Sequence, residues 1–107
     1  MNEYDARQYR MMKKQIRSYE EGGLGLNALI SNLEALMACL KAPDDAWLSD
    51  FRQQWSILEQ IYAVAADRQQ SLQRPEFVTS VALALERMKL KLSALNLKEE
   101  DLNSDDE

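Results

Sequence analysis

Acidic and aromatic side chains are concentrated in the middle of the chain, between residues 42 and 67. This window contains five carboxylates and one basic residue, Arg52, so its net charge is −4. It also contains both tryptophans, at positions 47 and 55. Carboxylates steer a positively charged partner toward a surface, and a tryptophan beside them can anchor the contact. The chemistry that this window predicts is recognition of a basic partner, and the candidate partner-binding residues are Asp44, Asp45, Trp47, Asp50, Glu59 and Asp67.

These residues also have a purely structural explanation. An aspartate at position 44 or 45 is expected to cap the helix that begins there, and the remaining acids would then be solvated. Both tryptophans lie on an apolar stripe, so we expect at least one of them to pack in the core. For the acids, the interface role and the structural role both remain open.

Catalytic chemistry has little support in the sequence. The chain has no histidine and a single cysteine, Cys39, so it lacks the commonest general base and a Cys/His zinc set. Phosphate-binding glycine loops and nucleophile motifs are also absent from the sequence. We therefore expect a protein that is not an enzyme and that needs no cofactor and no metal.

The cysteine count and the hydropathy pattern indicate a compartment. One cysteine cannot form an internal disulfide, which fits a reducing environment. The N-terminal residues contain no apolar signal region, and no apolar run approaches the length of a membrane span. The sequence predicts cytoplasmic localisation and no membrane partner.

Basic side chains are concentrated near the N-terminus, where residues 6–19 contain five of them and no acid. This segment could contact phosphates, or its charge could balance the acids elsewhere in the chain. Residues 99–107 carry six acids, so residues 1–98 have a net charge of +1 within a total of −5. Because the whole chain is acidic, we expect no direct nucleic-acid contact. A nucleic-acid-associated regulator that uses this segment remains an alternative.

Four apolar stripes with helical spacing predict the elements that position these residues. The expected helices cover about residues 5–20, 26–40, 44–68 and 75–95. Gly22 and Gly23 end the first helix, Asn27 is a plausible cap for the second, and Pro75 fits the first turn of the fourth. The expected fourth stripe begins at Val78 and contains valine, leucine and methionine. The sequence predicts an all-α, up-down four-helix bundle, with one helical domain over residues 1–98 and a disordered acidic C-terminal tail at 99–107.

Two segments in the middle of the chain carry a specific pattern. The first is L-I-S-N-L-E-A-L at 29–36, which is followed by the P-D-D turn at 43–45. The second is W-x-x-x-F-x-x-x-W-x-x-L-E-Q-I-Y-A-V-A-x-D at 47–67. This pattern resembles small helical immunity proteins of bacterial toxin systems. They include immunity proteins of contact-dependent growth inhibition loci and, more loosely, the colicin D immunity type. The chain departs from such proteins at Asn32, where they often carry an acid.

The resemblance implies a cytoplasmic antidote. Such a protein binds a cognate protein toxin domain, often a nuclease that acts on RNA or tRNA, and occludes its basic active site. The acidic candidate residues fit this role, because nuclease clefts are basic. We expect a monomer. An alternative is a small helical adaptor or secretion chaperone, which would bind an extended or amphipathic client.

Overall fold

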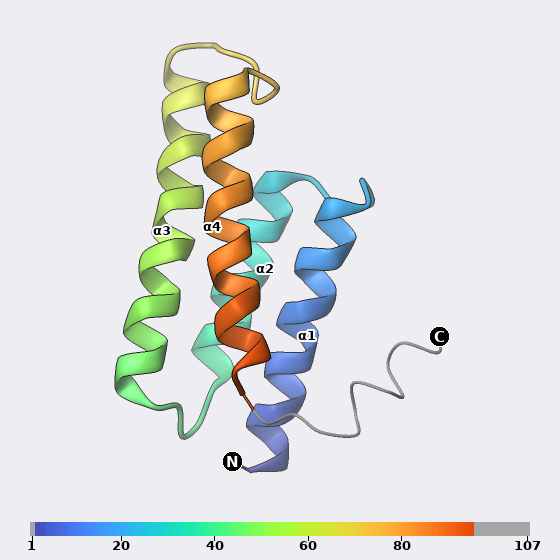
Figure 1. Cartoon of the computed structure of the whole chain (residues 1–107), viewed down its shortest axis with the longest axis vertical. Helices are drawn as coiled ribbons and strands as arrows, with labels where there is room; N and C mark the ends of the chain where they lie inside the picture. The colour runs from blue at the N-terminus through green and yellow to red at the C-terminus, as the bar shows by residue number, and fades with distance from the viewer. Residues whose placement is uncertain (1, 96–107) are drawn as a thin grey trace.

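Four α-helices form most of the computed structural model, which describes residues 2–95 (Figure 1). They are α1 (Glu3–Glu20), α2 (Leu26–Cys39), α3 (Asp45–Asp67) and α4 (Pro75–Ser93), and no strand occurs between residues 2 and 95. The predicted all-α class is therefore confirmed. The predicted tail at 99–107 lies outside the described residues.

The helix ends follow from local residues at four positions. The Asn2 side chain accepts a hydrogen bond from the Asp5 N–H at 2.7 Å, and Asp44 caps α3 by accepting one from the Trp47 N–H at 2.9 Å. Gly22 has a φ of +86°, the left-handed conformation that suits glycine after a helix C-terminus. Pro75 begins α4, as predicted.

The start of α2 at residue 26 is confirmed, but its N-cap residue differs from the expectation. Asn27 was expected to be its N-cap, but the helix already begins at Leu26 and Gly25 is the N-cap residue. Gly25 has an extended backbone and offers no side-chain hydrogen bond to the first turn. The reason is packing, because the buried Leu26 side chain is drawn into the core as part of the helix.

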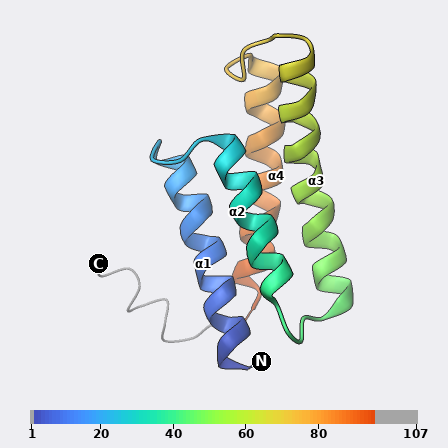
Figure 2. The same ribbon diagram turned by 180° about the vertical axis from the view of Figure 1, so that it is seen from behind.

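The helices run up and down, and each packs beside its neighbour in sequence, with α4 closing the bundle against α1 (Figures 1 and 2). The most deeply buried side chains come from all four helices: Met12, Ile16, Leu29, Leu33, Phe51, Leu58, Leu85, Met88 and Leu92. The indole N–H of Trp55 crosses from α3 to α2 and donates to the Ile30 carbonyl oxygen at 2.9 Å. α3 lies between two neighbours, because it packs against both α2 and α4.

The α3–α4 hairpin projects beyond the end of α1 and α2 and leaves a step there (Figures 1 and 2). This step explains why Val78, which was expected on the buried stripe of α4, is 46% exposed. Lys89 contacts Glu20, the last residue of α1, at 2.8 Å. The contact shows that Lys89 is level with the end of α1. Val78 lies about three turns before Lys89 on the same side of α4, so it lies beyond the end of α1, where no helix covers it. Phe77 is buried in its place.

Candidate functional site

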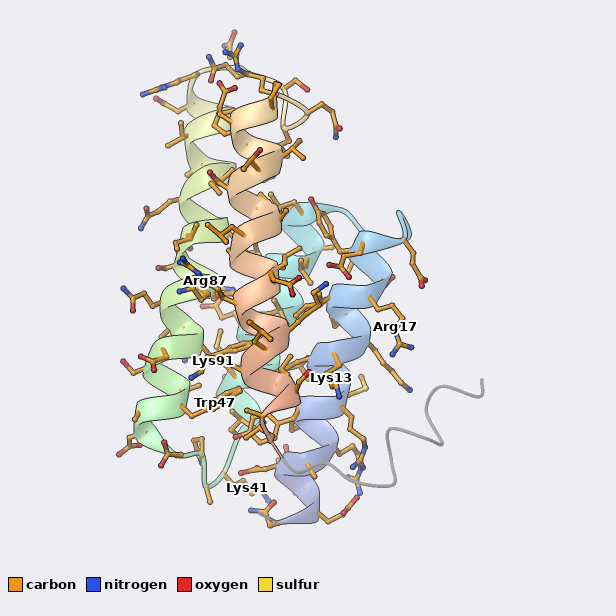
Figure 3. The ribbon with its side chains drawn as sticks, viewed as in Figure 1. Lys13, Arg17, Lys41, Trp47, Arg87 and Lys91 are labelled. Atoms are coloured by element: carbon orange, nitrogen blue, oxygen red, sulfur yellow. The ribbon has the colours of Figure 1, made fainter. Side chains whose placement is uncertain are left out.

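Trp47, the aromatic residue of the predicted partner-binding set, is half-buried and packs against the core of the bundle (Figure 3). Its ring stacks on Phe51, with 4.8 Å between centroids, and meets Tyr9 edge-on at 5.0 Å. Its indole N–H donates to the backbone carbonyl oxygen of Lys91 at 3.1 Å. The side chain thus ties α3 to both α1 and α4. These contacts match the structural role that the sequence left open for the tryptophans.

The two aspartates at the start of α3 differ in their contacts. Asp44 is the helix cap described above. Asp45 is the first residue of the helix, is exposed, and makes no ion pair or side-chain hydrogen bond within residues 2–95. Negative charge at this end is favourable because the helix dipole is positive there. Asp45 is therefore the aspartate that a partner could contact without disturbing the cap.

Asp50 and Glu59 lie on opposite sides of α3. They are nine residues apart, which is about two and a half turns of an α-helix. Asp50 faces α4, where its carboxylate oxygen lies 3.5 Å from the Nζ atom of Lys91. Glu59 follows Trp55 by about one turn, on the side where Trp55 reaches Ile30 of α2. The structure therefore separates these two acids, and they do not form one compact patch.

Asp45, Glu59 and Asp67 share one side of α3. At about 100° per residue the three positions fall within an arc of about 80°, and they span about 33 Å along the helix. All three are exposed, and none has an ion pair or side-chain hydrogen bond in the part of the chain that the structure describes. Arg52 is the one base on the same arc, and it is also exposed. We call these four residues the outer α3 surface.

Asp5 was not singled out by the sequence, yet it organises the end of the bundle where α3 begins. Its side chain is buried, at 1% exposure, and its carboxylate accepts the backbone N–H groups of Lys41 at 2.9 Å and Ala42 at 2.8 Å. These bonds hold the α2–α3 loop against α1. Burial, and then the nearby carboxylates of Asp5 and Asp44, raise the pKa of the Tyr9 hydroxyl. No local pattern could reveal the contact, because the partners are 36 and 37 residues apart.

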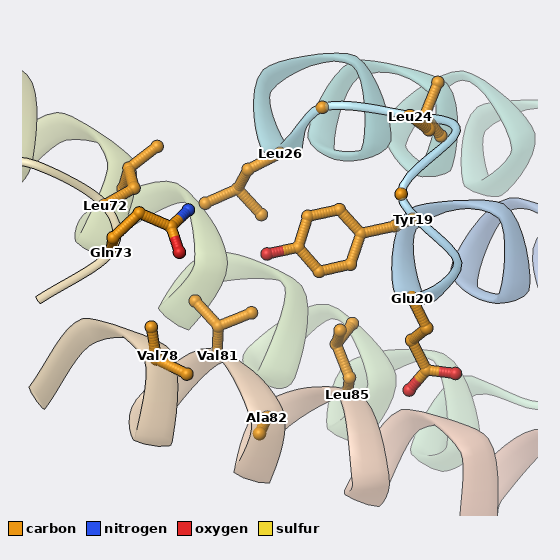
Figure 4. Close-up of a pocket in the computed structure, with 12 residues that line it drawn as sticks. Tyr19, Glu20, Leu24, Leu26, Leu72, Gln73, Val78, Val81, Ala82 and Leu85 are labelled. Carbon is orange, nitrogen blue, oxygen red and sulfur yellow. The ribbon is translucent and has the colours of Figure 1, made fainter. Parts of the chain in front are cut away.

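An apolar notch with a cavity volume of about 570 Å³ opens at the step (Figure 4). Leu24 and Leu26 line the side formed by the α1–α2 end, and Leu72 and Val78 line the side formed by the hairpin. Between them the Tyr19 ring extends across the opening, and burial raises the pKa of its hydroxyl. The volume lies in the range of small-molecule and side-chain pockets. The notch can therefore receive an apolar group from a partner.

A smaller cavity of about 160 Å³ lies along the seam between α1 and α4. Lys13, Arg17, Glu20, Lys89 and Ser93 line it, and we call it the basic groove. Figure 3 shows Lys13 at this seam. Lys89 donates to Glu20, and this hydrogen bond raises the pKa of the lysine. Three cations against one carboxylate make the groove suited to anionic groups.

The charges of the helices are sorted between the two halves of the bundle. Together α1 and α4 carry eight bases and five acids, whereas α2 and α3 carry one base and five acids. The first pair has a net charge of +3 and the second a net charge of −4. Because α1 neighbours α4 and α2 neighbours α3, the bundle has a basic side and an acidic side.

Within residues 2–95 there is no group of three or more Cys, His, Asp or Glu side chains that could hold a metal ion. Among those same residues, no helix combines the length and the apolar character needed to cross a membrane. Comparisons with family models, curated proteins and solved structures gave no match. The functional argument therefore depends on the residues themselves and on their arrangement.

Proposed function

We propose that this chain is an immunity protein, a non-enzymatic inhibitor that binds a cognate toxin domain and occludes its basic active site. The proposal is supported by the pattern in the middle of the chain, which resembles such inhibitors. The observation that carries it is the outer α3 surface, where Asp45, Glu59 and Asp67 are exposed and make no ion pair within residues 2–95. A nuclease is the toxin class that fits best, because its cleft is lined with bases that hold phosphates.

The packing of α3 suits this role. Phe51 and Leu58 are completely buried and Trp55 is bonded to α2, so the opposite side of the helix is held rigidly toward solvent. A rigid helix presents its carboxylates without the entropic cost of ordering the backbone that carries them. The surface is about 33 Å long and 10 Å wide, and its area is roughly 40% of the 800 Å² that a stable interface buries on each partner. We therefore expect the contact to extend onto α2, which lies beside Glu59.

The separation of acidic and basic helices also favours one orientation of the toxin domain on the bundle. A basic cleft is attracted to the α2–α3 side and not to the α1–α4 side, so encounters in the wrong orientation are disfavoured. Asp50 and Trp47 are not part of this revised surface, because Asp50 faces α4 and Trp47 packs between Tyr9 and Phe51. Asp44 contributes charge at the start of α3, while its side chain remains the helix cap.

The proposal predicts that the gene beside this one encodes a toxin domain, and that domain is the partner used in the test. The purified domain is incubated with tRNA and rising amounts of this protein, and cleavage is followed on a gel. We expect cleavage to stop at one equivalent of inhibitor and association to slow as salt is raised. Undiminished cleavage in the presence of excess protein would overturn the proposal, as would the absence of a toxin gene beside this one.

The apolar notch supports a second candidate, a small adaptor or secretion chaperone that binds an amphipathic client. An apolar side chain of a client helix would enter between Leu26 and Val78. In this case Val78→Glu should abolish binding of the client, while Glu59→Lys should leave it unchanged. The immunity proposal predicts the reverse for the toxin domain, so the same two variants distinguish the two functions.

A further inference from the structure

The bases of α1 form one continuous arc that begins at the basic groove. Lys13 and Arg17 line the groove, and Arg10, Lys14 and Arg7 follow around the helix within about 120°. Arg10 pairs with Glu3 at 2.9 Å, and the Arg10 guanidinium holds the pKa of that carboxyl below its usual range. On the α4 side, Lys89 contacts both Glu20 and Glu86. In total α1 has five bases and three acids, so its net charge is +2.

The end of the chain supplies the opposite charge. Residues 99–107 contain six acids and no base: Glu99, Glu100, Asp101, Asp105, Asp106 and Glu107. Without these nine residues the chain has a net charge of +1 instead of −5. The strongest concentration of acids and the strongest concentration of bases therefore lie at the two ends of the sequence.

The fold brings these two ends of the chain together. Because α4 runs antiparallel to α1, the last residues of α4 lie beside the N-terminal half of α1 (Figures 1 and 2). Leu95, the last described residue, is partly buried and packs against the core. Twelve residues follow it, and an extended chain of that length reaches about 40 Å. Since α1 is only about 27 Å long, the acidic residues can reach any of its bases.

We propose that residues 99–107 dock along the basic groove and the adjoining bases of α1, so that the chain's own acidic end occupies this anion-binding surface. A covalent connection of this length gives a local concentration of about a millimolar, which favours the intramolecular contact over free anions. The docked segment neutralises the basic side and keeps other polyanions away from it. This inference is independent of the toxin-binding proposal, which concerns the opposite side of the bundle.

Paramagnetic broadening in the full-length protein tests where the segment lies. A nitroxide is attached through Ser104→Cys in a Cys39→Ser background, and the backbone amides are observed by NMR. We expect broadening at Lys13 and Arg17 but not at Gln60 on α3, and we expect it to vanish near 1 M salt, where screening acts over about 3 Å. Absence of broadening at low salt would overturn the proposal. Broadening that appears only between differently labelled molecules would assign the contact to a second copy and also overturn it.

Polyanion binding tests the consequence of docking. A full-length variant has amides in place of all six acids: Glu99→Gln, Glu100→Gln, Asp101→Asn, Asp105→Asn, Asp106→Asn and Glu107→Gln. Its control has the same change in net charge at six other acids: Glu21→Gln, Glu34→Gln, Asp45→Asn, Glu59→Gln, Asp67→Asn and Glu76→Gln. With a short oligothymidine as the probe, the first variant should bind on the order of tenfold more tightly than the control. Equal affinities of the two variants would show that net charge alone is responsible and would overturn the proposal.

Discussion

Asp5 is the residue on which the geometry at the start of α3 most depends. Its buried carboxylate satisfies two backbone N–H groups in the loop that leads into the helix. Asp5→Ala removes both acceptors and leaves these groups without partners. Because hydrogen bonds to a charged group contribute about 1.5–3 kcal/mol each, we expect the free energy of unfolding to fall by roughly 3–6 kcal/mol. Urea denaturation followed by circular dichroism measures this change.

Asp45→Ala is the matched control for Asp5→Ala. It removes an aspartate near the same loop, but this side chain is exposed and makes no hydrogen bond within residues 2–95. Surface substitutions of this kind change stability by less than about 0.5 kcal/mol. Similar losses for the two variants would contradict the role assigned to Asp5.

Trp47 provides a second prediction at the scale of the residue. Trp47→Phe keeps an aromatic ring between Tyr9 and Phe51 but removes the hydrogen bond to the Lys91 carbonyl oxygen. We expect a loss of about 1 kcal/mol from the missing hydrogen bond, and a larger loss of roughly 3 kcal/mol for Trp47→Ala, which also leaves a cavity. Thermal denaturation and toxin affinity should be measured together. An alanine variant that keeps its stability but loses affinity would show that the ring anchors the interface.

At the scale of the elements, the helices were largely predictable because their signals are local. Periodic apolar residues mark each helix. The signals at the helix ends act within a few residues of their own position, and the structure has Gly22, Asp44 and Pro75 where they were expected. Val78 could not be placed correctly because its exposure depends on where α1 ends, which periodicity within α4 does not encode. Asp5 was missed for the same reason, since its partners lie on another element.

The grouping of the acidic residues shows a different limit. The nine-residue spacing of Asp50 and Glu59 already places them on opposite sides of one helix, so the sequence alone was sufficient to separate them. The spacing could not show which side of α3 faces a neighbouring helix. That required Lys91 beside Asp50 and the Trp55 hydrogen bond to Ile30.

The projecting end of the α3–α4 hairpin should be the less cooperative part of the fold. Phe77 and Ala65 are buried there, but they lie outside the main core cluster that contains Phe51. Phe51→Ala should therefore destabilise the protein by about 4 kcal/mol and Phe77→Ala by about half as much, because a two-helix end can relax around a cavity. Urea denaturation compares the two variants.

Hydrogen exchange provides an independent measure of the same hairpin. Amides at the projecting end should exchange by local opening, faster than amides beside Phe51, because fewer buried side chains hold them. Uniform protection along α3, together with equal losses for Phe51→Ala and Phe77→Ala, would show that the hairpin unfolds only with the whole bundle.

At the scale of the whole molecule, stability should decrease at alkaline pH. Burial raises the pKa of Tyr4, Tyr9 and Tyr19, and the hydrogen bond to Glu20 raises the pKa of Lys89. Folding therefore favours the protonated forms of these groups. Their contribution is complete below the unfolded-state values near pH 10 and is lost as pH rises through the higher folded-state values.

Urea midpoints measured from pH 8 to pH 11, with phenol absorbance recorded in parallel, check this alkaline loss. Tyr19→Phe removes one titrating group without removing the ring, so its stability should fall less steeply with pH than that of the wild type. A constant midpoint through the pH range in which the phenols ionise would contradict the expectation. Histidine, which usually titrates near neutrality, is absent from the chain and makes no contribution.

The sorted charges lead to a prediction about association with the toxin domain. Glu59→Lys and Asp50→Lys make the same change in net charge on the same helix but on opposite sides of it. Asp50 is 67% exposed in its side chain and loses only its contact with Lys91, which is worth at most about 1 kcal/mol. Both variants should therefore remain folded, as circular dichroism would show.

Glu59→Lys should slow association at low salt by on the order of tenfold, because it places a cation on the side that meets a basic cleft. Asp50→Lys should slow association less, since its charge faces α4. Stopped-flow mixing at increasing salt should bring the two rates together, because screening removes long-range steering but leaves the contacts of the complex in place. If both variants associate equally fast with the toxin domain at low salt, the outer α3 surface is not where the toxin binds.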